Sequence, residues 1–527
     1  MKNQDELHKE GWIQYVALPP PCLDDNTADV DRLTSQLKRQ LNAASIDMER
    51  SVMVSLPHVL RKSNFNVRCI LFGYDHRYQL LDVQPSNKCL PVYGLAIDLG
   101  TTRVVFRLLD LCNHSKITET TIDNPQGEIA PDVLARIHYT DQPGGLEHLQ
   151  KLIIDGINQQ IQNICIANGI ITDQIFCMSI AGNTCMTHLF LGFPPQAIIR
   201  EPYIPVVNRH IILPPIDLGL IINPQGRVFV FPNIGSYFGG DLISGILALD
   251  MHHQTEISIM VDVGTNAEVV LGNKDWMIAC AGAAGPALES GVSKIGMTAG
   301  PGAIERIKQD NQLFTWQTID NKKPVGICGS GFIDLAAVLF QSGMLDIRGK
   351  FVPDQCQDRL LIIDDIMHFL VVPADRSATG KDLTISQIDI DSLIRSKAAM
   401  YTILTTITQS VGIDLTDVSV FYVAGTFGAY IDPSSAITIG MIPDLPRSRY
   451  QSVGNTSIEG ASRVLLSRKD IESVSDIQNH ITYMELNVNQ EFMNRFSAAK
   501  FIPHTDTKLF PSVKRPLIGS MYRSGEK

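Results

Sequence analysis

Two similar segments, 164 residues apart at positions 98 and 262, constrain the fold of this chain more than any other feature. Asp98–Thr102 reads Asp-Leu-Gly-Thr-Thr after the apolar run Gly94–Ile97, and Asp262–Asn266 reads Asp-Val-Gly-Thr-Asn after Ile259–Val261. In each segment, a glycine after a strand lets the backbone turn tightly and bring its N–H groups close to phosphate oxygens. The aspartate suits Mg²⁺, which prefers a carboxylate combined with water and phosphate ligands. One such segment alone would more often be a plain hairpin, but two predict duplicated lobes that hold one nucleotide from opposite sides.

The motifs between and after these segments follow a recognisable order. A strand, a loop and an apolar helix are predicted over 228–246, and a strand with a glycine-rich turn is predicted over 420–428. This order resembles the actin-like ATPase superfamily, in which two hairpins hold phosphates, two crossing helices form a hinge and the late turn receives adenosine. The resemblance implies an α/β fold in which two duplicated lobes follow a small α/β domain. The sequence contains no P-loop and no convincing dinucleotide-binding fingerprint.

Candidate roles follow from side-chain chemistry and from this resemblance. Asp98 and Asp262 are the candidate Mg²⁺ ligands, and together with Asp241 they form the candidate catalytic set. Asp241 precedes the apolar run Leu242–Leu249, where related ATPases place a residue that orients the attacking water; the alternative is that it caps the helix. The candidate ATP contacts are Gly100, Thr101, Thr102, Gly264, Thr265, Asn266, Gly425, Thr426 and Gly428.

The sequence divides into three expected parts. Residues 1–22 end in three prolines and are predicted to be an irregular, linker-like segment. Residues 23–91 are predicted to form the small α/β domain, because the apolar spacing over Asp29–Leu41 is helical and two strand-like runs follow it. Residues 92–527 are predicted to form the ATPase domain.

Composition excludes several classes of function. The net charge is −11 and no dense Lys/Arg run occurs, so we expect no nucleic-acid partner. No apolar run approaches the roughly 18 residues of a membrane span, so we expect no membrane insertion. The polar start lacks the apolar core of a signal peptide, so we expect the protein in the cytoplasm. The ten cysteines lack any ferredoxin-type spacing and are predicted to be mainly small core residues.

Longer motifs point to a narrower family. From about Tyr15 to about Val513 the chain resembles the reductive activators of corrinoid-dependent methyltransferases and of corrinoid iron–sulfur proteins. The segments that carry this resemblance are Gly182–Gly192, Asp262–Asn273, Gly282–Glu289, Gly326–Asp334, Ile394–Ala399, Ile431–Pro433 and Val453–Ser457.

The resemblance implies an activity. Members of that family couple ATP hydrolysis to the uphill one-electron reduction of an inactive Co(II) corrinoid to Co(I). It implies ATP and Mg²⁺ as cofactors, and a corrinoid protein or corrinoid-dependent methyltransferase as partner. Residues 23–91 resemble the family's middle domain, which participates in dimerisation, so a homodimer is an expectation.

This sequence departs from the family pattern at two places. Typical members begin with a [2Fe–2S] ferredoxin-like domain, whereas this sequence begins near the linker that follows it and has no C-x₄-C-x₂-C set. We therefore expect no iron–sulfur cluster in this chain, with electrons from a separate ferredoxin; alternatively, the chain is a fragment or a degenerate paralogue. The second departure is Thr426, where the family usually has glycine and where the added side chain could crowd adenosine.

Two other functions stay open at this point. One is a non-enzymatic, nucleotide-gated module that binds a corrinoid protein without reducing it, which the missing cluster and Thr426 favour. The other is a small-molecule kinase of the same superfamily, for which no sugar-binding signature is visible. The intact segments at Asp98 and Asp262 favour the ATP-driven activator.

Overall fold

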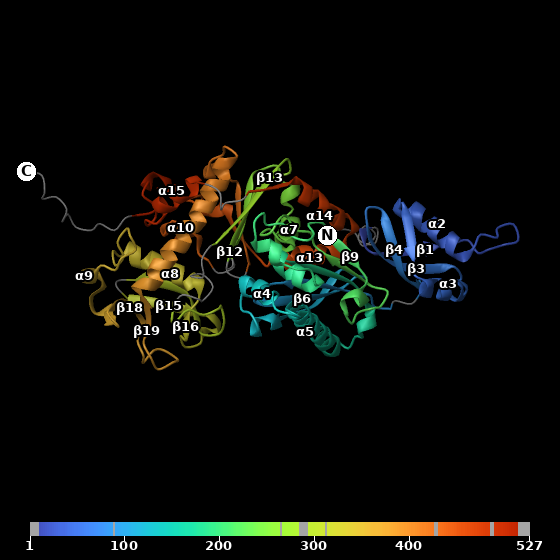
Figure 1. The fold of residues 1–527 in the computed structure, drawn as a ribbon, viewed down its shortest axis with the longest axis horizontal. Helices are drawn as coiled ribbons and strands as arrows, with labels where there is room; N and C mark the ends of the chain where they lie inside the picture. Colours follow the sequence, from blue (N-terminus) through green and yellow to red (C-terminus); the bar gives the residue numbers. More distant parts are fainter. Residues whose placement is uncertain are drawn as a thin grey trace, which may run out of the picture. The chain divides into compact units, whose positions relative to one another are not determined.

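The computed structural model describes residues 10–87, 90–263, 266–283, 293–310, 313–425, 431–484 and 490–514 (Figure 1). The chain divides into two compact units, one of Met1–His252 with Thr456–Ile481 and one of His253–Asn455 with Thr482–Lys527. Among the described helices, none is both long enough and apolar enough to cross a membrane.

A small four-stranded sheet opens the first unit, with strand order β1-β3-β4-β2. Its elements are β1 (Ile13–Ala17), α2 (Asp29–Leu41), β2 (Ser45–Met48), α3 (Arg50–Lys62), β3 (Asn66–Tyr74) and β4 (Arg77–Pro85). The predicted helix at Asp29–Leu41 is confirmed, and it buries Leu33, Leu37 and Leu41. The prediction of an irregular segment over residues 1–22 is wrong for Ile13–Ala17, which pairs antiparallel with β3 and buries Ile13, Gln14 and Val16.

The remainder of the first unit is built on a six-stranded sheet of order β7-β6-β5-β8-β10-β9. Its strands are β5 (Tyr93–Leu99), β6 (Arg103–Asp110), β7 (Ser115–Asp123), β8 (Ile175–Gly182), β9 (Ile211–Leu213) and β10 (Arg227–Val230). Its helices are α4 (Val133–Tyr139), α5 (Gly145–Asn168), α6 (Thr184–Leu191), α7 (Gly240–Ala248), α13 (Thr456–Leu466) and α14 (Arg468–His480). Apolar side chains at helical spacing along α5, among them Ile153 and Ile157, pack with Leu95 and Ile97 of β5 to form its core.

The second unit contains another six-stranded sheet, of order β21-β20-β11-β12-β13-β22, and two three-stranded sheets, β15-β14-β16 and β17-β18-β19. Its strands are β11 (Ser258–Val263), β12 (Asn266–Gly272), β13 (Met277–Ala283), β14 (Ala303–Asp310), β15 (Leu313–Thr318), β16 (Gly326–Ile327), β17 (Leu360–Ile363), β18 (Ile366–Val372), β19 (Leu383–Ser386), β20 (Val420–Ala424), β21 (Tyr450–Gly454) and β22 (Ile481–Tyr483). Its helices are α8 (Gly329–Gln341), α9 (Pro353–Cys356), α10 (Gln387–Ser410), α12 (Pro433–Thr438) and α15 (Gln490–Ala499).

Five strands of each six-stranded sheet share one connectivity, in keeping with the repeated sequence segments, and the sixth strands, β9 and β22, lie at opposite edges. In the first, β5, β6 and β7 are antiparallel neighbours, and β8 and β10 continue parallel to β5. In the second, β11, β12 and β13 are antiparallel neighbours, and β20 and β21 continue parallel to β11. Asp98 lies opposite Ala181 of the parallel neighbour, and Asp262 lies opposite Ala424 of its own. The two aspartates are therefore equivalent in register, as duplication of whole lobes predicts.

Helix α13 belongs to the first unit although β21, the strand before it, belongs to the second. It packs against α7, and Figure 1 draws this orange-red helix beside the green one. Gly460 makes the close approach possible, because a Cβ atom there would lie 2.0 Å from the carbonyl oxygen of Ser244. The first unit thus contains a crossing of two helices, the feature expected of a hinge.

Candidate functional site

The first predicted phosphate hairpin joins β5 to β6, with Asp98 near the end of an otherwise buried strand. Asp98 itself is half-buried, whereas Thr102 is exposed at the turn. Gly100 is required by the turn, since a Cβ atom there would lie 2.5 Å from the carbonyl oxygen of Arg103. The hairpin prediction is therefore confirmed in geometry, and its carboxylate and hydroxyl groups lie at one end of the sheet.

Polar side chains beneath the turn hold its backbone in place. Asn124 donates from Nδ2 to the carbonyl oxygen of Gly100 over 2.9 Å, and Arg136 donates from Nη2 to that of Thr101 over 2.7 Å. Arg136 is fully buried and also donates to the carbonyl oxygen of Ala130. Burial lowers the pKa of Arg136, and within the described residues no carboxylate forms an ion pair with it. A weakly compensated positive charge thus lies under the turn, where it favours an anion.

Asn183 connects the hairpin to the neighbouring helices. Its Oδ1 accepts from the backbone N–H of Met186 and so caps α6, while its Nδ2 donates to Oγ1 of Thr101 over 3.0 Å. The start of α7 packs directly against it, because a Cβ atom at Gly239 would lie 2.4 Å from Cα of Asn183. Asp241 is half-buried in the first turn of α7, and its Oδ1 accepts from the N–H of Leu242 over 2.9 Å.

The structure separates two interpretations of Asp241. The residue that caps α7 is Gly239, so Asp241 is not the N-cap. Its carboxylate lies beside that glycine, since Oδ1 would be 2.7 Å from a Cβ atom at Gly239. Thr101 and Asp241 are therefore linked through Asn183 and Gly239, which is consistent with both facing one bound group.

Asp98 is itself anchored by the first turn of α13. Ser457 donates from Oγ to Oδ1 of Asp98 over 2.8 Å, and its side chain is almost completely buried. This contact joins residues that are 359 positions apart in the sequence.

The second hairpin is described in part. Asp262 is half-buried near the end of β11 and lies opposite Glu268 of β12. Asn266 begins β12. Gly425 directly follows β20 and has a φ of 81°, a left-handed conformation that glycine adopts without strain. The other predicted ATP contacts here, Gly264, Thr265, Thr426 and Gly428, lie outside the described residues.

The glycine-rich segment Gly326–Gly331 serves packing. A Cβ atom at Gly331 would lie 2.2 Å from the carbonyl oxygen of Ile304, so the start of α8 sits directly on β14. A Cβ atom at Gly326 would lie 2.5 Å from the carbonyl oxygen of Ile295. Of the two possibilities for this segment, backbone packing and ligand contact, the structure supports packing at these two glycines.

A hollow of about 410 Å³ lies in the second unit, among β14, α8 and the segment that follows the late glycine turn. Apolar atoms come from Ile307, Ala337 and Val338, and polar groups come from Gln341 and Asp432 among others. Asp432 also caps α12, its Oδ1 accepting from the N–H of Ser434. The hollow is therefore lined mainly by polar residues, with a smaller apolar contribution from Ile307, Ala337 and Val338.

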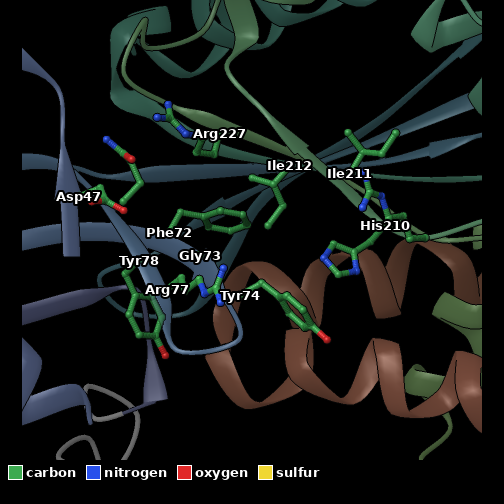
Figure 2. Close-up of a pocket in the computed structure, with 12 residues that line it drawn as sticks. Asp47, Phe72, Gly73, Tyr74, Arg77, Tyr78, His210, Ile211, Ile212 and Arg227 are labelled. Carbon is green, nitrogen blue, oxygen red and sulfur yellow. The ribbon is translucent and has the colours of Figure 1, made fainter. Parts of the chain in front are cut away.

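A second hollow, of about 620 Å³, lies in the first unit between the small sheet and β9 (Figure 2). Phe72, Ile212 and His210 approach it from opposite sides, and Arg77 and Arg227 add positive charge at its rim. None of the predicted site residues lines this hollow, so it is separate from the phosphate hairpin.

Four residues of this site had no predicted role: Asn124, Arg136, Asn183 and Ser457. Asn183 and Ser457 lie in segments that carried the family resemblance, so a signal for them was present. Asn124 and Arg136 had no local signal, because a single Asn or Arg between elements is common and their partners are distant backbone carbonyls.

The residues present fit a hydrated magnesium nucleotide. A carboxylate, hydroxyl groups and a helix start converge around the first hairpin, and these oxygen donors are the ones that Mg²⁺ prefers. The second aspartate occupies the equivalent register position in the other sheet.

Known families match nearly the whole chain. A family model described as the RACo linker region matches residues 4–89, and one described as the RACo middle region matches 93–254. A third, described as the C-terminal domain of RACo, the ASKHA domain, matches 256–514. The predicted α/β fold of the actin-like ATPase class is therefore confirmed.

Individual relatives agree with these matches. The corrinoid activation enzyme RamQ of Eubacterium limosum is 32% identical over 82% of this chain and 75% of its own length. The reductase of the Co(II) methylated amine-specific corrinoid protein of Methanosarcina barkeri is 24% identical over 74% of this chain and 73% of its own. A solved reductive activator for corrinoid, iron-sulfur protein is 39% identical, covers 96% of this chain and 81% of that chain, and superimposes with a TM-score of 0.85.

Proposed function

Because this chain belongs to the RACo family of reductive activators, we propose that it returns an inactive Co(II) corrinoid protein to the Co(I) state. The observation that carries the proposal is the similarity to a corrinoid activation enzyme over 82% of the chain, together with three successive family matches. The partner is accordingly a corrinoid protein or a corrinoid-dependent methyltransferase.

We also propose that ATP hydrolysis drives this reduction. Asp98 and Asp262 would hold Mg²⁺ through its water shell, and bound Mg²⁺ would neutralise charge on the phosphates. Thr101, Thr102 and the backbone at Gly100 would receive phosphate oxygens, favoured by the buried charge of Arg136. Asp241 would orient the attacking water from the first turn of α7. The corresponding contacts of the second hairpin would be Gly264, Thr265 and Asn266.

Adenosine would bind in the second unit. Gly425, Thr426 and Gly428 are the predicted backbone contacts, and the hollow beside Ala337 and Asp432 supports the location of the purine. Its volume of about 410 Å³ is within the common range for small-molecule sites.

The need for ATP follows from the energetics of the electron transfer. Each 100 mV of uphill reduction for one electron costs about 2.3 kcal/mol. A protein can supply this only by binding the reduced corrinoid state better than the oxidised one in one of its conformations. Hydrolysis of ATP can switch between a conformation that favours Co(I) and one that releases it.

We propose that the electron comes from a separate ferredoxin. Iron–sulfur clusters need exposed or clustered thiolates. In the described part of the chain, burial raises the pKa of the thiols of Cys69, Cys177, Cys185, Cys280 and Cys356. These thiols are poor sources of thiolate ligands. A homodimer is a further proposal, which sedimentation equilibrium tests.

The experiment that tests the function is reduction of a panel of Co(II) corrinoid proteins, followed by the Co(I) absorbance, with reduced ferredoxin and ATP. We expect ATP-dependent Co(I) formation and ATPase activity that the Co(II) partner stimulates. The double variant Asp98→Asn/Asp262→Asn should lose both. Asp155→Asn should retain both, because Asp155 is exposed on α5, where it pairs with Lys151 at the surface.

Two outcomes would contradict the proposal. Co(I) formation that does not depend on ATP would remove the proposed motor. Tight binding of the corrinoid protein with neither turnover nor reduction would instead favour the nucleotide-gated binding module.

A further inference from the structure

The hydrogen bond from Ser457 to Asp98 lies next to the point where the chain passes from the second unit to the first. The chain passes from the second unit to the first between Asn455 and Thr456, and Ser457 is the next residue. We propose that Ser457 is a positioning residue for Asp98, and that it links the phosphate hairpin to the connection between the two units. The proposal rests on the proposed function, because it takes Asp98 to be the Mg²⁺-side carboxylate.

The connection itself has a defined shape. Strand β21 ends at Gly454, whose φ of 64° is left-handed, and α13 begins two residues later. Glycine adopts this conformation without strain, so the chain can reverse direction there. Ser457 lies in the first turn of the helix that follows, with its side chain almost completely buried.

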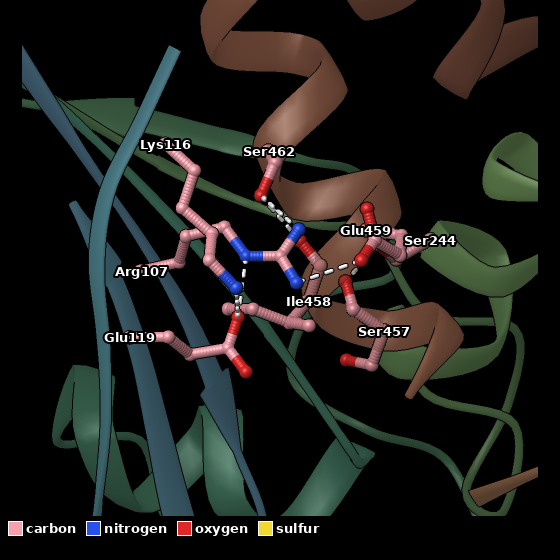
Figure 3. A network of polar contacts seen from close by, with 8 residues as sticks. All are labelled: Arg107, Lys116, Glu119, Ser244, Ser457, Ile458, Glu459 and Ser462. Atoms are coloured by element: carbon pink, nitrogen blue, oxygen red, sulfur yellow. Dashed lines mark hydrogen bonds and ion pairs between the residues drawn. The ribbon is translucent and has the colours of Figure 1, made fainter. Parts of the chain in front are cut away.

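Ser457 is held on two sides. Its Oγ donates to Oδ1 of Asp98 over 2.8 Å, and its carbonyl oxygen accepts from Oγ of Ser244 on α7 over 2.7 Å. Figure 3 shows Ser457 and Ser244 next to one another at the start of α13. The same residue therefore contacts the candidate metal ligand and the helix that carries Asp241.

A second group of contacts fastens α13 to the sheet that carries the hairpin. Arg107 of β6 donates to Glu459 of α13 over 2.7 Å and to Glu119 of β7 over 2.7 Å (Figure 3). It also reaches Oγ of Ser462 over 3.4 Å. The Arg107 side chain is 9% exposed, whereas its partner Glu459 is 53% exposed, so the Arg107–Glu459 ion pair is half-shielded from solvent. Because these contacts attach α13 to β6 and to α7, we expect the helix to move together with the hairpin.

The chemical consequence concerns the orientation of Asp98. A hydroxyl donor on one carboxylate oxygen fixes the rotation of the carboxylate, as neighbours of metal ligands do. Loss of such a donor typically weakens metal binding or activity by about 10- to 100-fold. If Asp98 shifts when phosphate is lost, Ser457 would shift with it, and so would the adjacent residues that connect the two units.

The test measures Mg²⁺-dependent ATP binding to the full chain by calorimetry, with and without Mg²⁺. We expect Ser457→Ala to weaken binding of Mg²⁺-ATP by about tenfold and to leave Mg²⁺-free ATP binding within about twofold. Ser457→Thr keeps the hydroxyl and should recover most of the affinity. The control Ser462→Ala removes another buried hydroxyl of the same helix, which donates to the carbonyl oxygen of Ile458. Its contact with Arg107 is long, at 3.4 Å, and Arg107 keeps both carboxylate partners, so this variant should bind Mg²⁺-ATP like the unaltered protein.

A second readout reports the link to the connection. Amide hydrogen exchange at residues 453–458 should slow when Mg²⁺-ATP binds to the unaltered protein and should respond less in Ser457→Ala. Equal losses in the alanine and threonine variants, or Mg²⁺-ATP affinity in Ser457→Ala within about twofold of normal, would overturn the positioning role while the proposed function stands. Absence of Mg²⁺-dependent ATP binding in the unaltered protein would overturn both.

Discussion

The close packing of α7 against α13 predicts that Gly460→Ala destabilises the protein, although helix propensity alone would predict that it stabilises α13. Alanine is normally about 1 kcal/mol better than glycine inside a helix, so Gly460→Ala should stabilise an isolated α13. In the folded chain the new Cβ would lie 2.0 Å from the carbonyl oxygen of Ser244 and 2.4 Å from its Oγ. Carbon–oxygen contacts come no closer than about 3.3 Å, so the helices must separate by roughly 1 Å.

That separation has a cost that can be worked out from the structure. Overpacking costs about 1–3 kcal/mol, and stretching the 2.7 Å hydrogen bond from Ser244 to the carbonyl oxygen of Ser457 adds about 1 kcal/mol. After subtraction of the roughly 1 kcal/mol gained from helix propensity, Gly460→Ala should lower the free energy of unfolding of the first unit by about 1–3 kcal/mol. For a unit of this size, the midpoint of thermal unfolding should fall by about 2–5 °C.

Thermal unfolding followed by circular dichroism measures this change. Gly300→Ala is the matched control, because its Cβ would have the carbonyl oxygen of Thr298 at 3.8 Å as its closest neighbour and should shift the midpoint by about 1 °C or less. A midpoint for Gly460→Ala equal to or above that of the unaltered protein would refute the close crossing. The same variant should lower ATPase activity, because Ser457 moves away from Asp98.

Three further predictions follow from other contacts. Burial lowers the pKa of His188, and its Nε2 accepts from the N–H of Val206. Because the unfolded chain then takes up the proton first, the free energy of unfolding should fall as the pH drops below about 6.5, by up to about 1.4 kcal/mol per pH unit. Urea unfolding of His188→Gln should show a smaller loss over the same pH range. A double-mutant cycle of Arg107→Gln and Glu459→Gln should give a coupling free energy of about 0.5–1 kcal/mol, which should decrease in 1 M salt because Glu459 is 53% exposed. A coupling free energy of zero would show that this ion pair does not hold α13 against β6. Val338 is a partly exposed residue that lines the 410 Å³ hollow. Val338→Trp should raise the dissociation constant for ATP at least tenfold without changing that for pyrophosphate, whereas equal affinity for ATP would exclude adenosine from this hollow.

Local elements were predictable where a single periodicity dominated. The apolar spacing of Asp29–Leu41 corresponds to α2, since it buries one continuous stripe. The hairpin after Asp98 was predictable because glycine and hydroxyl residues between two apolar runs have few other uses.

Other elements were missed for identifiable reasons. Strand β1 was not predicted although Ile13, Tyr15 and Val16 favour a strand, because a single short run of this kind forms a strand only when a partner such as β3 lies beside it. Helix α3 contains Pro57, which argues against a helix in isolation, yet its buried Val52, Leu56 and Leu60 form an adequate stripe.

The sequence alone determined that two equivalent Asp-x-Gly-Thr segments follow strands, where their aspartates lie and which family the chain resembles, since these depend on residues that are close together along the chain. The tertiary structure decided which side chains support the first hairpin. Arg136 and Asn183 reach Thr101 from 35 and 82 positions away, and Ser457 reaches Asp98 from 359 positions away. No local pattern can encode such contacts, because hydrogen bonds act over about 3 Å and only the folded sheets and crossing helices bring these groups within that distance.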